Sequence, residues 1–400
     1  MYLLASMLMA VGMAIQQVLY NLYLVELGFT EDFIGQVAAA VALGVALGGI
    51  PSGLLYDRLS GRFTFPVATL GIVLSMVMRS LIVQPEWLIF WAVMNGIANS
   101  VYFVSIFPFI TGHSSTHERA HLYGANIAVW TGFMMLGSFL AGFLPGIWST
   151  LWNGTDVIQQ HRMSLLTAAA VGVLATFPFL RIRPSDMLPT SRRRKILPSS
   201  ESKSSIIYGA IVLFLVGMVI GLTTPFYNVY FKRIFAAQDT IIGALFSLSQ
   251  VMGLLSAFFL PYIVRRWGLV LGPSLVLIIN APFILAVGLP LPFTLISLLF
   301  LFSSGMERLG EAPLMNLVME AVPPDDRGAM SGIRLISSYG AQALAGALGG
   351  WLIIRIGYSG LFTSAAGIQA LAAGGIWLLF RSKRQNLETT HAASTTQEIS

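Results

Sequence analysis

The chain has 400 residues, of which 56% are hydrophobic and only 10% are charged, and its formal net charge is +6. Soluble proteins carry about 25% charged residues, so this composition excludes an ordinary water-soluble protein. The chain has no cysteine, which excludes disulfide bonds and thiol chemistry.

Apolar runs long enough to cross a bilayer recur along the whole chain. Residues 37–55 and 206–222 carry no charge, and each is long enough to cross most of a hydrocarbon core of about 30 Å as a helix. Lipid offers the backbone no hydrogen-bond partner, so these runs must be helical. We predict an all-α membrane protein with twelve transmembrane helices. In chain order the predicted spans are 3–26, 33–56, 64–83, 87–111, 120–146, 163–180, 206–231, 240–263, 268–288, 292–320, 328–354 and 358–380.

The predicted spans fall into two sets of six, separated by a polar segment that contains the basic run Arg192–Lys195. We expect an N-terminal six-helix half over residues 1–180 and a C-terminal six-helix half over residues 206–381. The segment 181–205 is expected to be a cytoplasmic basic linker, and residues 382–400 a disordered cytoplasmic tail.

Basic residues are distributed unevenly over the loops. Of the 23 Lys and Arg residues, 16 lie in loops on one side and four in loops on the other. Positive charge collects on the cytoplasmic side, so both termini and the linker are predicted to be cytoplasmic, in a multi-pass protein of the cell (plasma) membrane. The basic loops then face anionic lipid headgroups, which accounts for the net charge without a nucleic-acid partner.

The two halves resemble each other at an offset of 207 or 208 residues. Tyr20–Tyr23 reads Tyr-Asn-Leu-Tyr, and Tyr227–Tyr230 reads Tyr-Asn-Val-Tyr. Six spans restore the original orientation, so the halves are predicted to be parallel repeats about an axis along the membrane normal. Chance matching among apolar helices is the alternative, which the polar matches disfavour. Further pairs are Gly35 with Gly243, Arg58 with Arg266, Glu118-Arg119 with Asp326-Arg327, Gly124 with Gly332 and Gly142 with Gly350.

The loop between the second and third predicted spans carries a motif. Residues 53–62 read Gly-Leu-Leu-Tyr-Asp-Arg-Leu-Ser-Gly-Arg, which resembles the G-x-L-x-D-R-x-G-R pattern of the major facilitator superfamily, with its second glycine one residue late. This resemblance implies two six-helix halves and secondary transport by alternating access. It also implies an inner gate, in which a carboxylate contacts a helix end of the opposite half; simple interfacial anchoring is the alternative. The implied gate residues are Gly53, Asp57, Arg58, Gly61, Arg62, Arg119 and Arg327.

Polar side chains inside membrane spans are costly and indicate functional sites. In the family, spans 1, 4, 7 and 10 line the central cavity, and here those spans carry polar clusters. Gln16 and Tyr20, for example, are four residues apart and share one helix face. The alternative is that the amides hold neighbouring helices together. The predicted substrate-binding residues are Gln16, Gln17, Tyr20, Asn21, Asn95, Asn99, Tyr102, Thr224, Tyr227, Asn228, Glu307, Arg308 and Glu311.

The tenth predicted span places Glu307, Arg308 and Glu311 within an arc of about 100° of the helix. Two carboxylates facing one guanidinium leave one carboxylate incompletely compensated, so we predict proton coupling through Glu307 or Glu311. The alternative is that Arg308 simply neutralises one of them. One feature argues against coupling by the family's usual route, because proton-linked members often carry an arginine where this chain has Ala92.

These patterns favour a proton-coupled secondary transporter of a small solute. The stretch Gly137–Gly142 partly resembles the family's antiporter motif and tilts the prediction slightly toward export of a drug or metabolite. Uptake of a polar metabolite by a proton symporter is one alternative, and a non-transporting membrane sensor or scaffold with the same fold is another. No catalytic or phosphate-binding motif occurs, so we expect no enzyme activity, no cofactor and no metal. The expected partners are a small-molecule solute, protons and the lipid bilayer, with no nucleic acid, and the protein is expected to be a monomer.

Overall fold

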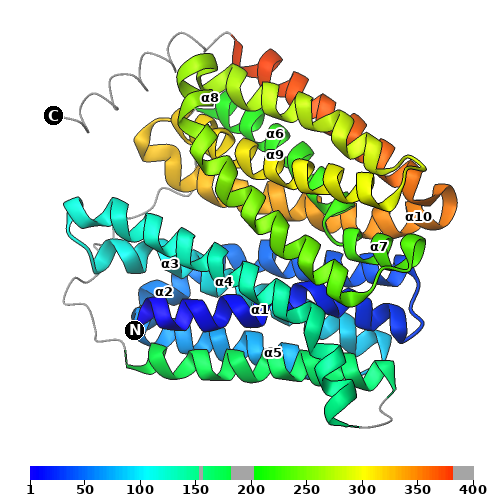
Figure 1. Ribbon diagram of the computed structural model, residues 1–400. Coiled ribbons are helices and arrows are strands. Elements are labelled where there is room, and N and C mark those ends of the chain that lie inside the picture. The colour runs from blue at the N-terminus through cyan, green and yellow to red at the C-terminus, as the bar shows by residue number, and fades with distance from the viewer. Residues whose placement is uncertain (153–155, 182–201, 382–400) are drawn as a thin grey trace. The chain divides into compact units, whose positions relative to one another are not determined.

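The computed structural model describes residues 1–152, 156–181 and 202–381, and the regular structure of these residues is helical throughout (Figure 1). The all-α prediction is therefore confirmed for the described part of the chain. Most of the predicted linker and all of the predicted tail lie outside the described residues.

The described residues of the first predicted half form five helices. The longest has 51 residues, about 77 Å at 1.5 Å per residue, which is more than twice a hydrocarbon core of about 30 Å. It therefore contains both predicted spans 33–56 and 64–83, and its backbone stays helical through the predicted loop between them. The helices are α1 (Tyr2–Glu26), α2 (Glu31–Leu81), α3 (Pro85–Gly112), α4 (Thr116–Leu151) and α5 (Val157–Leu180).

In the second predicted half, too, the helices do not correspond one to one with the predicted spans. The span predicted at 206–231 is broken near Pro225, because proline has no backbone N–H to donate and disfavours helical geometry at the residue before it. The elements are α6 (Lys203–Thr223), α7 (Tyr227–Phe235), α8 (Asp239–Val287), α9 (Phe293–Glu320), the short 3₁₀ helix η1 (Pro324–Asp326) and α10 (Arg327–Phe380).

Two glycines interrupt the longest helices of this half. Gly268 in α8 has φ 74° and ψ −178°, and Gly357 in α10 has φ 71° and ψ 178°. Only glycine adopts this backbone geometry readily, so each interruption separates two predicted spans. Ten described segments are long and apolar enough to cross a membrane, and two of them are α8 and α10, each of which holds two predicted spans. This count is consistent with twelve spans.

The described helices form two compact units. Unit 1 contains α1 to α5, α7, the start of α8 up to Val251, and Gly346–Arg355 of α10. Unit 2 contains α6, α9, the rest of α8 and the remaining parts of α10. Segments of the second sequence repeat thus pack within unit 1. The half boundaries expected from the sequence stay a prediction.

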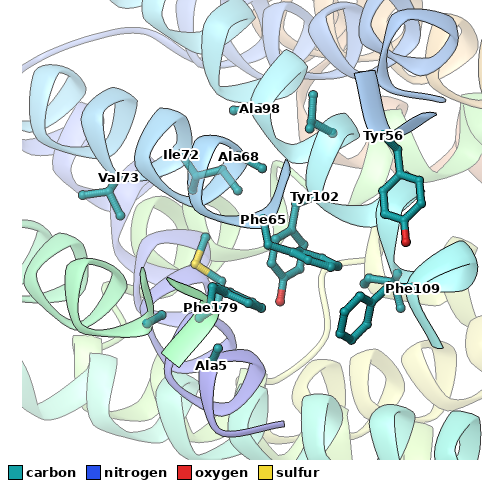
Figure 2. Packing of buried hydrophobic residues seen from close by; sticks show 14 of the residues in the cluster. Ala5, Tyr56, Phe65, Ala68, Ile72, Val73, Ala98, Tyr102, Phe109 and Phe179 are labelled. Atoms are coloured by element: carbon teal, nitrogen blue, oxygen red, sulfur yellow. The ribbon is translucent and has the colours of Figure 1, made fainter. Parts of the chain in front are cut away.

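Unit 1 has an aromatic core centred on Phe65. The Phe65 ring stacks on Phe179 with centroids 4.9 Å apart, and it meets Tyr102 and Phe109 edge-on at 5.7 and 5.2 Å (Figure 2). These rings come from α2, α3 and α5, and α1 adds Ala5 to the same cluster. Offset and edge-on contacts of this kind stabilise helix packing beyond the apolar area they bury.

Unit 2 has its own apolar core. Leu213 of α6, Val270 of α8, Leu317 of α9 and Phe380 of α10 all lie in one buried cluster. Because lipid is as apolar as these side chains, close packing rather than exclusion of water holds them together.

Glycines allow α2 and α3 to approach each other closely. A Cβ atom on Gly96 would lie 2.1 Å from the carbonyl oxygen of Val41, and one on Gly44 would lie 2.2 Å from that of Val93. No side chain fits at these distances, so the helix pair depends on both glycines. In α4, Gly137 and Gly142 also lie against neighbouring backbone, whereas Gly124 has open space around it.

We predict that Gly96→Ala destabilises the protein by about 1–3 kcal/mol, the usual effect of forcing a methyl group into a packed contact. The measurement is the thermal unfolding midpoint of the detergent-purified protein. Gly124→Ala is the matched control, because nothing lies within 4 Å of the added methyl group, and it should unfold at or above the wild-type temperature. Equal midpoints for the two variants would contradict the close-packing account.

Candidate functional site

Unit 1 contains a buried cation, the guanidinium group of Arg79. Arg79 of α2 is only 5% exposed, and its guanidinium carbon lies 3.8 Å from the centre of the Tyr20 ring. A cation over an aromatic face is attracted by the ring's electrons, which stabilises Arg79 at this position. The Nε atom of Arg79 has no hydrogen-bond partner among the described residues.

Two predicted site residues of α1, of which Tyr20 lies under this cation, also have polar atoms without a partner in the described part of the chain. Gln16 and Tyr20 are both buried on α1, and neither the Gln16 amide nor the Tyr20 hydroxyl has a hydrogen-bond partner within the described chain. An unpaired buried polar group usually costs about 1–3 kcal/mol. Gln16 lies one turn before Tyr20 on α1, and Arg79 lies over the Tyr20 ring. We call these three residues the unpaired polar face, and their polar atoms that lack a partner among the described residues suit a polar ligand.

Two predicted amides of α3 form a short hydrogen-bonded chain. Asn95 donates from Nδ2 to the Ser75 hydroxyl at 2.8 Å, and Asn99 donates to the Asn95 Oδ1 at 3.0 Å. Ser75 lies one helical turn before Arg79 on α2, so this chain runs along the same side of α2 as the cation. The Oδ1 atom of Asn99 has no partner in the described structure.

The asparagine of each Tyr-Asn segment of the repeat donates to a backbone carbonyl that lies two residues before the other segment, within unit 1. Asn21 donates to the carbonyl oxygen of Pro225 at 2.7 Å, and Asn228 donates to that of Val18 at 2.9 Å. The break before α7 supplies the free carbonyl at Pro225. These amides connect α1 to the α6–α7 break, which is the helix-connecting alternative raised by the sequence.

The other predicted residues of unit 1 have varied positions. Gln17 is exposed on α1, and Thr224 is half-buried in the break before α7. Tyr227 is buried, as is Tyr102, which packs in the aromatic core with its hydroxyl 3.4 Å from that of Ser6. A role in solute binding stays a prediction for each of these residues.

Unit 2 holds the three charged residues predicted for α9. Arg308 and Glu311 are 56% and 59% exposed, and their nearest charged atoms are 3.9 Å apart, while Glu307 is half-buried. A Cβ atom on Gly253 of α8 would lie 3.2 Å from Cγ of Arg308, so the absence of a side chain there makes room for the arginine stem.

The predicted gate residues are only partly described. Gly53 is half-buried and Arg58 is exposed on α2, whereas the side chains of Asp57, Gly61 and Arg62 lie outside the described set. Arg119 donates to the carbonyl oxygen of Thr111 at 3.4 Å. Arg327 is exposed in the first turn of α10. The gate therefore stays a prediction.

The two acidic–basic pairs of the repeat occur at helix starts. At the start of α4, the Ser115 hydroxyl and backbone N–H donate to Glu118 at 2.8 and 3.4 Å, and the Glu118 N–H donates back to the hydroxyl. This capping box satisfies free N–H groups, and the hydrogen bonds lower the pKa of the Glu118 carboxyl. Asp326 precedes α10 and accepts from the Ser202 hydroxyl.

Sequence reasoning missed a charge cluster at the end of α1. Lys232 Nζ of α7 lies 3.3 Å from a Glu26 carboxylate oxygen and 3.0 Å from Oδ1 of Asp239. The second oxygen of Asp239 lies 3.2 Å from Nε2 of His161, whose side chain is fully buried. We call these four residues the charge cluster. Each of the four belongs to a different helix, so the spacing of residues within one helix could not predict their contacts.

Further polar contacts surround the charge cluster. Arg162 donates from Nε to the Ser80 carbonyl at 3.1 Å and from Nη2 to the Tyr23 hydroxyl at 3.2 Å, and Tyr23 donates to the same carbonyl. Arg233 lies 3.4 Å from a Glu31 carboxylate oxygen. This end of unit 1 is thus connected by several charged contacts among α1, α2, α5, α7 and α8.

Solved structures with the same fold are transporters. A bacterial homologue of the human lysosomal transporter Spinster, inward-facing and occupied, has a TM-score of 0.77, 16% identity and 95% coverage of both chains. The nucleoside transporter NupG has a TM-score of 0.75 and 15% identity, over 95% of this chain and 98% of its own. The inward-open xylose transporter XylE from E. coli has a TM-score of 0.74 and 13% identity, over 94% and 95% of the two chains.

Sequence comparison identifies the family. No curated protein matches this chain. The family model described as Major Facilitator Superfamily matches residues 2–333 and 209–399, which together cover nearly the whole chain. This protein therefore belongs to the major facilitator superfamily.

Proposed function

We propose that this protein is a proton-coupled secondary transporter that carries a small polar or amphipathic solute by alternating access. The fold and the family support secondary transport in general. The proposals for the coupling ion and for the class of solute are based on the polar residues within the predicted spans.

The observation that carries this proposal is the exposed charge in the middle of α9. Arg308 and Glu311 are more than half exposed near the centre of a helix that is otherwise apolar enough to cross a membrane. Charged side chains at that depth face a water-filled path or a polar surface, because exposure to hydrocarbon is very costly. Two carboxylates with a single guanidinium leave one that can bind and release a proton.

A second feature supports alternating access. Within unit 1, the charge cluster and the Asn21 and Asn228 amides join helices of the first sequence repeat to segments of the second. All these contacts lie towards the end of α1 that carries Glu26. Hydrogen bonds and ion pairs of this kind suit a closure that forms and breaks in each cycle.

The glycines of α4 do not settle the direction of transport. Gly137 lies against Val11 and Ala14 of α1, and Gly142 against Asp239 and Thr240 of α8, so close packing accounts for both. Direction is therefore assigned by experiment: an exporter and an uptake symporter move protons in opposite senses relative to the solute, and a scaffold moves neither.

We predict that Glu311→Gln or Glu307→Gln lowers solute-driven proton flux in proteoliposomes by about tenfold or more, within the usual range of coupling between two sites. The flux is followed with a pH-sensitive dye inside the vesicles. Uridine, adenosine and xylose are the first probes, because nucleosides and xylose are named for the similar structures NupG and XylE. Solutes that raise the unfolding temperature of the purified protein follow as further probes.

The control for these variants is Glu86→Gln, in the first turn of α3 and outside the predicted site. It should keep wild-type flux. If both α9 variants retained transport driven by a pH gradient, proton coupling through these carboxylates would be wrong.

We also predict that Tyr20→Phe separates solute binding from stability. The Tyr20 hydroxyl has no partner among the described residues, so its removal should leave the unfolding temperature unchanged or slightly raised. Solute binding should weaken about threefold to tenfold, the value of one hydrogen bond. The measurement is the unfolding temperature without solute and its dependence on solute concentration.

The matched control is Tyr23→Phe, three residues further along α1. That hydroxyl bonds to Ser80 and Arg162, so its loss should cost about 1–3 kcal/mol of stability. If Tyr20→Phe destabilised the protein as much as Tyr23→Phe and left binding unchanged, the unpaired polar face would have no part in the solute site.

A further inference from the structure

His161 lies between two hydrogen-bond acceptors. Its Nδ1 atom is 3.0 Å from the carbonyl oxygen of Val157, one turn earlier on α5, and its Nε2 atom is 3.2 Å from Oδ2 of Asp239. A carbonyl only accepts, so Nδ1 carries a hydrogen. In the neutral ring, Nε2 would then present a lone pair to a carboxylate. A second proton on the imidazole removes that repulsion and creates an attraction.

The charges around His161 also favour a second proton on its imidazole ring. Asp239 of α8 faces it directly, Lys232 of α7 lies on the far side of Asp239, and Glu26 of α1 lies on the far side of Lys232. With a neutral imidazole this cluster has one more negative than positive charge, and with an imidazolium the charges balance. The neighbouring cations are already engaged, Arg162 with Tyr23 and Ser80, and Arg233 with Glu31.

Burial makes the proton and the closure depend on each other. The His161 side chain is 0% exposed while it contacts Asp239, so it exchanges protons with water only when α5 and α8 separate at this point. Once protonated, it strengthens the contact that hides it. Asp239 is also the first residue of α8, where the helix dipole favours a negative charge and so favours the charged carboxylate as the partner of the imidazole.

We infer that the His161–Asp239 pair is a proton-binding site that closes this end of the protein. By the loop-charge prediction this end faces outward, so protons taken from the outside favour the closed outer end. The inference rests on the proposed alternating-access function and adds a proton site that is separate from the α9 carboxylates. Because a neutral histidine weakens the cluster, acidification closes this end and alkalinisation opens it.

The test is a distance measurement between two spin labels in lipid nanodiscs. The chain has no cysteine, so Val83→Cys and Ile234→Cys introduce unique labelling sites at exposed positions near the charge cluster. Pulsed electron spin resonance is recorded at about pH 5.5 and about pH 8.5, on either side of the ordinary imidazole titration near 6.5. We expect the ratio of long to short distances to rise about fivefold or more at the higher pH.

Three variants assign this response. His161→Gln should show the same distances at both pH values. Asp239→Asn removes the negative partner of His161 and should show the long distances at both pH values. His121→Gln replaces an exposed histidine of α4 and should keep the wild-type response. Monodisperse elution of each variant confirms that it is folded.

The outcomes separate this inference from the proposed function. The proton site is wrong if the wild type does not respond to pH, or if His161→Gln responds as fully as the wild type. Alternating access still stands in either case, provided that Asp239→Asn gives the long distances. If the distances are the same in all variants and at both pH values, this end does not open, which contradicts the proposed function as well.

Discussion

The structure depends on one constraint, which is that hydrocarbon cannot hydrogen-bond. Every backbone N–H and carbonyl within the membrane must therefore be satisfied by the chain itself, and helices do this locally. The exceptions are informative. At Pro225 the helix breaks and leaves a free carbonyl, and Asn21 bonds to that carbonyl. The break is thus stabilised by an amide from another helix of the same unit.

The same constraint divides the buried polar residues into two groups. Asn21, Asn228 and Asn95 donate to named partners, and these bonds join one helix to another. Gln16, Tyr20 and Arg79 are equally buried but have polar atoms without a partner among the described residues. Since an unsatisfied buried group is costly, its retention is most simply explained by a ligand that completes its hydrogen bonds. Stability accounts for the first group, and we propose that solute binding accounts for the second.

Charge follows a related division. Glu26 ends α1, where the helix dipole disfavours a carboxylate, and Lys232 lies beside it in the last turn of α7, where the dipole favours a cation. The charge cluster pairs charges of opposite sign at the ends of helices. Arg308 and Glu311 lie near the centre of α9 and remain more than half exposed. A cluster of paired charges suits a closure, whereas exposed charge at membrane depth suits a path for solute or protons.

The sequence by itself determined the helical class, the repeat and the family, because these follow from apolar run length, a recurring offset and a local motif. It also placed Glu311 beside Glu307 and Arg308 of α9, since residues three or four apart on a helix share a face whatever surrounds them. It did not distinguish Tyr102, which packs in an aromatic core, from Tyr20, which lies under a guanidinium. Nor did it show that His161 meets Asp239 across 78 positions of chain. Only the tertiary structure decided these contacts, because burial and pairing between helices depend on which faces pack together, and the spacing within one helix carries no information about its neighbours.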